Sequence, residues 1–267
     1  MAVSIEKKYQ KLTDTEHVLL RPGMYVGSIK PHTEEVFLPM KGKDQFQLTE
    51  VTYNPGFLKL FDEIVSNSVD EHKRNIKLNK VKVDIDMSTG LISIWDNGGI
   101  PVKIHKEYDE WVPEMIFSNL KAGSNFDDTE DRVVVGTNGV GSTLTNIFSK
   151  EFIIETCDGK KQFAQTFKNN MSERTKAKIT NKKTAYTKIT YLTDFNRFGL
   201  KGINKNHYLM ITKRLIDIAA CNPNLKIFLN DKPIAFRTFK DYASRYVTPV
   251  FYDQSEHWKI GIGHSTT

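Results

Sequence analysis

The segment F-D-E-I-V-S-N-S-V-D-E, from Phe61 to Glu71, decides the fold that we predict. It follows an Asn-Pro-Gly helix breaker, and apolar side chains recur through it at helical spacing, which predicts a helix over residues 57–75. At about 100° of rotation per residue, Glu63, Asn67 and Asp70 share one face of this helix. The apolar residues on the opposite face are Phe57, Phe61, Ile64, Val65 and Val69.

The polar face of this helix suits a site for a magnesium nucleotide. The amide oxygen of Asn67 is a hard, neutral ligand for Mg²⁺, and the carboxylate of Glu63 can orient and deprotonate a water molecule. Every amphipathic surface helix has a polar face, however, and taken alone this simpler interpretation is favoured. The motif therefore needs support from elsewhere in the chain.

A predicted β-hairpin ends in a second polar motif. Residues 81–87 alternate apolar and polar side chains, a Ser-Thr-Gly turn follows, and residues 91–95 continue the pattern. The second strand runs into Asp96-Asn97-Gly98-Gly99-Ile100-Pro101. A carboxylate at this strand end can accept a hydrogen bond from an exocyclic amine such as that of adenine, and the glycines leave room for a planar ring. The same residues are equally typical of an ordinary turn that binds no ligand.

A glycine-rich cluster precedes a further predicted helix that begins near residue 139. Ser142 stands where a P-loop requires lysine, so the cluster is not a nucleotide-binding loop of the Walker type. Exposed N–H groups before a helix N-terminus nevertheless favour an anion such as a triphosphate, and a flexible loop is the alternative. The cluster is Gly136, Thr137, Asn138, Gly139, Val140, Gly141, Ser142 and Thr143.

The segment before this cluster adds small polar donors and then acids. Gly123, Ser124 and Asn125 supply the donors. Carboxylates would repel a phosphate, so we predict that the following acids lie on the outside of a lid. These acids are Asp127, Asp128, Glu130 and Asp131.

Composition limits the class of protein. The chain has 267 residues with 38 Lys+Arg and 32 Asp+Glu, hence a formal charge of 38 − 32 = +6, and 39% of its residues are hydrophobic. This length forms one large domain or two small ones, and the apolar content excludes a disordered chain. There is no run of about 18 apolar residues and no signal-peptide pattern, so we predict a cytoplasmic protein without a membrane partner. Two cysteines, Cys157 and Cys221, predict reduced thiols rather than a disulfide framework.

The remaining pattern predicts a mixed β-sheet with helices on one face, an α/β (α+β) two-layer sandwich. Residues 21–28 are predicted to turn rather than to form a helix, because they contain Pro22, Gly23 and Gly27. Residues 173–184 are predicted to be irregular. The other predicted strands are 37–51 (as a pair), 152–157, 161–167, 187–191, 225–229 and 233–236, and the other predicted helices are 112–120 and 208–220.

Three motifs in this order resemble the Bergerat (GHKL) ATP-binding fold shared by DNA gyrase, Hsp90, histidine kinases and MutL. They are the Glu-x-x-x-Asn helix, Asp-x-Gly after a strand, and a glycine-rich lid before a helix. Within that superfamily the chain resembles the ATPase domain of type IIA DNA topoisomerases. The sequences of its motifs are nearer to those of eukaryotic and T-even-type bacteriophage enzymes than to those of gyrase, and its compact length favours a phage large subunit. The stretches that carry this resemblance are residues 9–28, 61–71 and 136–149.

The resemblance implies a set of residue roles. Glu63 would be the general base for the attacking water, Asn67 the protein ligand of Mg²⁺, and Asp96 the group that reads the adenine amine. Thr187 would support adenine through water, and Tyr9 would reach the nucleotide of a second subunit, so that ATP binding and homodimer formation are one event. The other residues expected to contact ATP are Asp70, Gly98, Gly99, Ile100, Gly123, Ser124, Asn125, and residues 136–143.

The resemblance also implies a domain division and partners. Residues 1–30 would form a dimerisation arm, 31–245 the ATPase domain, and 246–267 the start of a transducer domain. Its Gln-Thr-Lys loop is not in this sequence, so we expect a fragment that works with the remaining topoisomerase domains or subunits, in the host cytoplasm if the source is a phage. The Asp-x-Gly-x-Gly pattern of the family is one residue shorter here, which puts the position of Gly99 against adenine in doubt.

The function that follows is ATP-driven closure of a dimer around double-stranded DNA without base reading. The alternative is a nucleotide-binding dimerisation module with negligible hydrolysis, and a kinase or chaperone with the same fold has little support. Basic residues could line the DNA passage, although a solvated charged loop is the favoured interpretation. They are Arg174, Lys176, Lys178, Lys182, Lys183 and Lys188.

Overall fold

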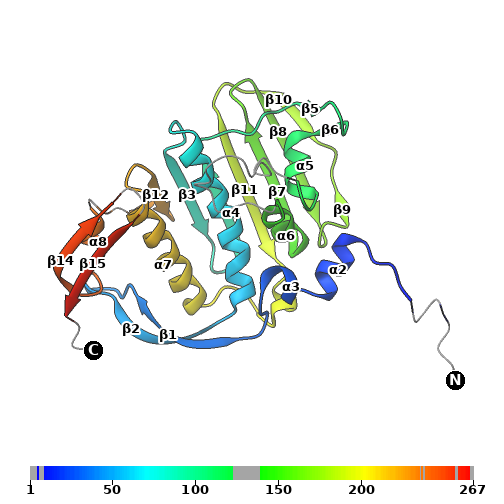
Figure 1. The fold of residues 1–267 in the computed structure, drawn as a ribbon. Helices are drawn as coiled ribbons and strands as arrows, with labels where there is room; N and C mark the ends of the chain where they lie inside the picture. The colour runs from blue at the N-terminus through cyan, green and yellow to red at the C-terminus, as the bar shows by residue number, and fades with distance from the viewer. Residues whose placement is uncertain are drawn as a thin grey trace.

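A computed structural model describes residues 5, 9–122, 139–234, 236, 238–255 and 258–264 of the chain, and the side chains of residues 249 and 250 are not described. Figure 1 shows a large twisted sheet with helices packed on one face. The predicted two-layer α/β architecture is therefore confirmed. Among the described residues, no helix is long and apolar enough to cross a membrane.

The large sheet is mixed. Its strand order is β10-β8-β7-β11-β4-β3-β12-β13, and β9 pairs with β8. Neighbouring strands are antiparallel except β12 and β3, which run parallel. The strands are β3 (Lys80–Ile85), β4 (Leu91–Asp96), β7 (Ser149–Cys157), β8 (Lys161–Lys168), β9 (Glu173–Arg174), β10 (Lys178–Asn181), β11 (Tyr186–Thr193), β12 (Lys226–Leu229) and β13 (Lys232–Ile234).

Helix α4 (Pro55–Arg74) is the predicted helix that carries Glu63 and Asn67. The side chain of Asn54 caps it by accepting a hydrogen bond from Phe57 N at 3.0 Å, and Pro55 occupies the first turn, where its missing N–H is not needed. The buried side chains fix the helix against the sheet, and each large one stabilises the fold by about 1.5–3 kcal/mol. They include Phe57, Leu60, Phe61, Ile64 and Val65.

The other helices continue this layer. Helix α6 (Gly141–Ile147) lies beside α4, α5 (Val112–Ser118) packs against α6, and α7 (Lys205–Cys221) packs on the other side of α4 (Figure 1). A 3-10 helix spans Phe195–Phe198, and α8 (Phe239–Ala243) follows the sheet. The core between helices and sheet brings together α4 and the inner side chains of the central strands.

Three small antiparallel ribbons surround this sandwich. The predicted pair within residues 37–51 is β1 (His32–Leu38) with β2 (Gln47–Tyr53), which begins and ends outside the predicted bounds. The pair β5 (Ile104–His105) and β6 (Glu110–Trp111) precedes α5, and β14 (Thr248–Gln254) pairs with β15 (Lys259–His264) near the C-terminus. The division at residues 30 and 245 remains a prediction.

Two sequence predictions were wrong. The turn predicted for residues 21–28 contains the four-residue helix α3 (Gly23–Val26), because Pro22 already has helical dihedral angles and its absent N–H costs nothing at a helix start. It follows α2 (Asp14–Leu20), which a capping box of Thr13 and Glu16 begins. The stretch predicted to be irregular, residues 173–184, contains β9 and β10, since both pair with β8 on the side that faces away from β7.

Candidate functional site

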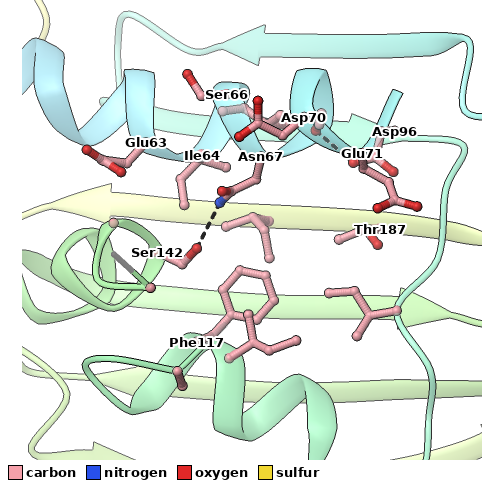
Figure 2. A pocket seen from close by; sticks show the side chains of 18 of the residues that line it. Glu63, Ile64, Ser66, Asn67, Asp70, Glu71, Asp96, Phe117, Ser142 and Thr187 are labelled. Atoms are coloured by element: carbon pink, nitrogen blue, oxygen red, sulfur yellow. Dashed lines mark hydrogen bonds between the residues drawn. The ribbon is translucent and has the colours of Figure 1, made fainter. Parts of the chain in front are cut away.

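A cavity of about 630 Å³ lies between α4, the inner face of the sheet, the turn after β4 and the start of α6. Figure 2 shows Asn67 of α4 pointing toward Ser142 of α6, with Glu63 at one end of the view and Asp96 and Thr187 of the central strands at the other. Polar residues from all three predicted motifs share this cavity. The predicted residues that line it are Glu63, Asn67, Asp70, Asp96, Gly99, Ile100, Gly139, Val140, Gly141, Ser142 and Thr187.

Glu63 lies at one end of the cavity. Its Oε1 is 2.6 Å from Nζ of Lys59, one helical turn earlier, and its side chain is 22% exposed. A Cβ atom added at Gly141 would collide with the carboxylate, so a larger residue at the start of α6 would displace the side chain of Glu63 from this position. The carboxylate is thus paired with Lys59, close to the start of α6 and still accessible to a water molecule.

Asn67 is oriented by a residue of the glycine-rich motif. Its Nδ2 donates a hydrogen bond to Oγ of Ser142 at 2.8 Å (Figure 2), which leaves the carboxamide oxygen for another partner. The described residues contain no group of three or more His, Cys, Asp or Glu side chains that could hold a metal ion. A single neutral oxygen ligand suits Mg²⁺, which keeps several waters and is otherwise held by phosphates. Asp70, one turn further along α4, is buried and also lines the cavity.

Asp96 lies at the opposite end of the cavity, at the last position of β4. It is only 7% exposed, and its Oδ2 accepts a hydrogen bond from Oγ of Ser68 at 2.7 Å. Its Oδ1 accepts one from Gly98 N at 2.9 Å. Burial raises the pKa of Asp96 from its ordinary value of 3.8 to about 6, although the hydrogen bonds from Ser68 and Gly98 act in the opposite direction. Asp96 is therefore a buried, oriented acceptor that is ionised at neutral pH.

The turn after Asp96 packs tightly against β7. A Cβ at Gly99 would collide with the carbonyl oxygen of Cys157, which explains the glycine at this position. Ile100 N donates to Oγ1 of Thr156 at 3.1 Å, and that hydroxyl is 3.0 Å from Oγ1 of Thr187. The shortened turn thus still places Gly99 at the cavity. The buried side chain of Thr156 connects this turn to Thr187.

The prediction from sequence missed several lining residues. Lys59, Glu71 and Arg74 add charge along α4, and Ser68 binds Asp96 from the buried face of the same helix. Apolar residues form the walls between the two polar ends, a lining that suits a flat aromatic ring. They are Ile64, Ile94, Val112, Ile116, Phe117 and Ile189. The sequence did offer a signal for Ser68, which is a serine within the apolar stripe of α4. The apolar cavity walls offered none, because they depend on how the strands pack.

Not every predicted residue is brought to the cavity. Thr143 is buried and donates to the carbonyl oxygen of Asn119 at 3.0 Å, and Gly98 contributes its N–H to Asp96 rather than a cavity wall. Tyr9 is 70% exposed in the N-terminal segment. The predictions for Gly123, Ser124, Asn125, Gly136, Thr137, Asn138 and the acids at 127, 128, 130 and 131 lie outside the described residues.

The mixed sheet, the single layer of helices and a cavity beneath a Glu-x-x-x-Asn helix define the Bergerat (GHKL) fold class. Solved structures agree. The structure is similar to the ATPase region of Saccharomyces cerevisiae topoisomerase II, with a TM-score of 0.89 and 35% identity over 94% of this chain and 69% of that one. The ATPase and transducer domains of Balamuthia mandrillaris DNA topoisomerase II give a TM-score of 0.90 and 37% identity, over 94% of this chain and 67% of that one.

This chain belongs to the ATPase region of the type II DNA topoisomerases. It is 43% identical to DNA topoisomerase 2 of Acanthamoeba polyphaga mimivirus and 42% identical to that of Arabidopsis thaliana, over 99% and 95% of its length. It spans only 22% and 17% of these two relatives. No protein-family model matches the chain. The similarity to giant-virus and eukaryotic enzymes does not support the predicted T-even phage origin. That prediction relied on short motif sequences and on chain length, which do not discriminate between these sources.

Proposed function

We propose that this chain binds ATP with Mg²⁺ in the cavity beneath α4 and hydrolyses it to ADP and phosphate. One observation carries the proposal: Glu63, Asn67 and Asp96, from two separate elements, line the same cavity, with apolar walls between its two ends. The membership of the ATPase region of type II topoisomerases supports it independently.

The adenine end would be Asp96 and its neighbours. The ionised carboxylate accepts a hydrogen bond from the exocyclic amine, while Gly99 and Ile100 allow the ring to lie close to the turn. Thr187 would contribute a hydroxyl to the same end, and the apolar walls would enclose the ring.

The phosphate end would be Glu63 and Asn67. Asn67 would hold Mg²⁺ through its amide oxygen, and the bound ion would supply positive charge against the charge that develops on the phosphates. Glu63 takes a proton from water as the water oxygen attacks the terminal phosphorus in line, and the bond to the ADP oxygen breaks. Gly139, Gly141 and Ser142 line this end and offer backbone N–H groups and a hydroxyl to the phosphates.

We extend the proposal to the assembly. Nucleotide binding would close a homodimer through residues 1–30 with Tyr9 reaching the partner's nucleotide, around a DNA duplex that the complete enzyme passes through another. Residues 31–245 would be the ATPase domain, and 246–267 would lead into a transducer domain. The basic residues from Arg174 to Lys188 would contact this DNA, and the protein would act in the cytoplasm. The relatives named DNA topoisomerase 2 support the extension.

A second candidate is a nucleotide-binding dimerisation module with negligible turnover by itself. The chain spans 69% of the Saccharomyces ATPase region, and this candidate assumes that the remainder of such a region is needed for turnover. Steady-state hydrolysis by this chain, with and without a C-terminal extension taken from such a relative, decides between the two. Equal rates contradict the second candidate, and turnover that requires the extension supports it.

Calorimetric titration with a non-hydrolysable ATP analogue tests the binding that both candidates require. We expect saturable 1:1 binding that strengthens when Mg²⁺ is present and is lost when Asp96 is replaced by alanine. Binding that is indifferent to Asp96→Ala, or no binding by the folded chain, would overturn the assignment of this cavity.

A further inference from the structure

The side chain of Asn97 connects the turn after Asp96 to the loop that follows α4. Its Oδ1 accepts hydrogen bonds from the backbone N–H groups of Asn79, at 3.0 Å, and Lys80, at 2.9 Å. Its Nδ2 donates to the carbonyl oxygen of Lys77 at 3.1 Å and to Oδ1 of Asn79 at 3.2 Å. One half-buried carboxamide thus makes four hydrogen bonds to a single loop, which uses both its donor and its acceptor capacity.

That loop is itself fixed to the end of α4. Nδ1 of His72 is 2.5 Å from the carbonyl oxygen of Leu78, and both residues are buried. The side chain of Leu78 lies against Gly98, where an added Cβ would be 2.7 Å from Leu78 Cδ1. The loop therefore packs against the turn and also forms hydrogen bonds with it. Through these contacts the end of α4 is connected to residues 97 and 98.

The turn controls where the carboxylate of Asp96 points. Gly98 N donates to Oδ1 of Asp96, so a shift of Gly98 moves or releases one of the hydrogen bonds that orient the carboxylate. On its other side the turn is held by Thr156, which accepts from Ile100 N. Asn97 thus fixes the edge of the turn nearest to Asp96, and Thr156 fixes the edge nearest to β7.

We propose that Asn97 is a positioning residue for purine recognition, which holds Asp96 and the glycine turn in register with α4 without touching the nucleotide. The inference rests on the proposed function, because it assumes that Asp96 reads the base. It adds that selectivity for adenine depends on a side chain that points away from the cavity into the α4–β3 loop. Asn97 is absent from the residues that line the cavity, although it stands in the chain between Asp96 and Gly98, which donates to Asp96.

The test compares the chain with Asn97→Ala, Asn97→Ser and a matched control, Asp86→Ala. Asp86 makes the same kind of contact at the opposite end of the β3–β4 hairpin, where its Oδ1 accepts from Ser88 N at 2.8 Å and Ser88 Oγ at 2.6 Å. Asn97→Ser retains a short polar side chain that is compatible with a turn, so it covers the case in which the alanine variant does not fold. Binding of non-hydrolysable ATP and GTP analogues is measured by calorimetry, and the melting temperature is recorded for each variant.

We expect both Asn97 variants to bind the ATP analogue about tenfold more weakly, which corresponds to the loss of about 1.4 kcal/mol, and to discriminate less between ATP and GTP. Asp86→Ala should lower the melting temperature without changing either binding constant. Asn97 variants that melt lower but keep the affinity and the ATP preference of the parent would overturn the inference alone. A parent chain that binds neither analogue would overturn the proposed function and this inference together.

Discussion

The two ends of the cavity are built differently. At the adenine end, Asp96 and Ser68 are 7% and 5% exposed and bonded to each other, and the adjoining turn is fixed by Asn97 and Thr156. At the phosphate end, Glu63 is partly exposed and pairs with Lys59, while Asn67 is exposed and bonds to Ser142.

This difference indicates a division of tasks. A buried, crosslinked carboxylate is preorganised to recognise a base, because little has to move when the ligand arrives. A half-exposed carboxylate and amide can adjust to phosphates, Mg²⁺ and water, which themselves complete the site. Burial of an ionised Asp96 has a cost in stability, and its raised pKa records that cost. Perturbing each end should therefore give different phenotypes.

The largest effect is expected from Glu63→Gln. The amide cannot take a proton from water, so ATP hydrolysis should fall by about 10²- to 10⁴-fold, while binding of ATP is retained. Steady-state phosphate release and calorimetry measure the two quantities separately. Glu155→Gln is the matched control, since Glu155 is also paired with a lysine, Lys188, at 3.5 Å, but is absent from the cavity lining. Retained turnover in Glu63→Gln would remove Glu63 from the mechanism.

Gly141→Ala should have the next largest effect. The new Cβ would collide with the carboxylate of Glu63 and displace it, and a misplacement of about 1 Å at a reacting group can cost about a hundredfold in rate. We expect the rate of hydrolysis to fall by about ten- to a hundredfold, with a smaller change in ATP affinity. Gly202→Ala is the control, because no atom lies within 4 Å of the added Cβ there. Equal rates for the two variants would show that Glu63 is not confined by α6.

Asp96→Asn tests the adenine end and should separate affinity from stability. ATP should bind about tenfold more weakly, because the amide presents a weaker acceptor than the carboxylate. The fold should become more stable at pH 8, by at most about 3 kcal/mol, because an ionised buried carboxylate is removed.

The pH dependence of this gain follows from the direction of the pKa shift. Between about pH 4 and pH 6 the folded parent holds a proton on Asp96 that the unfolded chain has lost, so the parent loses stability as pH rises through this window. The advantage of Asp96→Asn should therefore be full above pH 6 and vanish below pH 4. Denaturant unfolding at several pH values measures it, and a gain that is independent of pH would contradict the assignment of the shift to Asp96.

The smallest effect is expected from Ser142→Ala. Loss of the hydroxyl that accepts from Asn67 Nδ2 frees the amide to rotate, so the Mg²⁺ concentration for half-maximal hydrolysis should rise about two- to fivefold. Ser93→Ala removes a hydroxyl paired with Thr190 instead and should leave the Mg²⁺ requirement unchanged. An unchanged requirement in Ser142→Ala would show that the hydrogen bond does not orient Asn67.

The sequence was sufficient where a local rule determines the structure. Asn54, Pro55 and the apolar spacing after them predicted α4, and the helical period then placed Glu63, Asn67 and Asp70 together on one side. The alternating pattern before Asp96 predicted its position at a strand end.

The sequence was insufficient where the structure depends on pairing between segments that are far apart in the chain. Strands β9 and β10 are recognisable only through their pairing with β8, and the apolar walls of the cavity depend on which strands lie side by side. Ser68 and Asn97 act through partners that are 28 and 17 to 20 positions away in the sequence, respectively. Periodicity cannot supply such pairings.

The central claim is that one cavity binds the adenine at Asp96 and the terminal phosphate at Glu63. A crystal structure of this chain with a non-hydrolysable ATP analogue and Mg²⁺ tests it most directly. The account predicts the exocyclic amine of adenine within hydrogen-bonding distance of Asp96, and Mg²⁺ bound by the amide oxygen of Asn67. A nucleotide bound elsewhere on the molecule, or bound here with its base at Glu63 and its phosphates at Asp96, would contradict it.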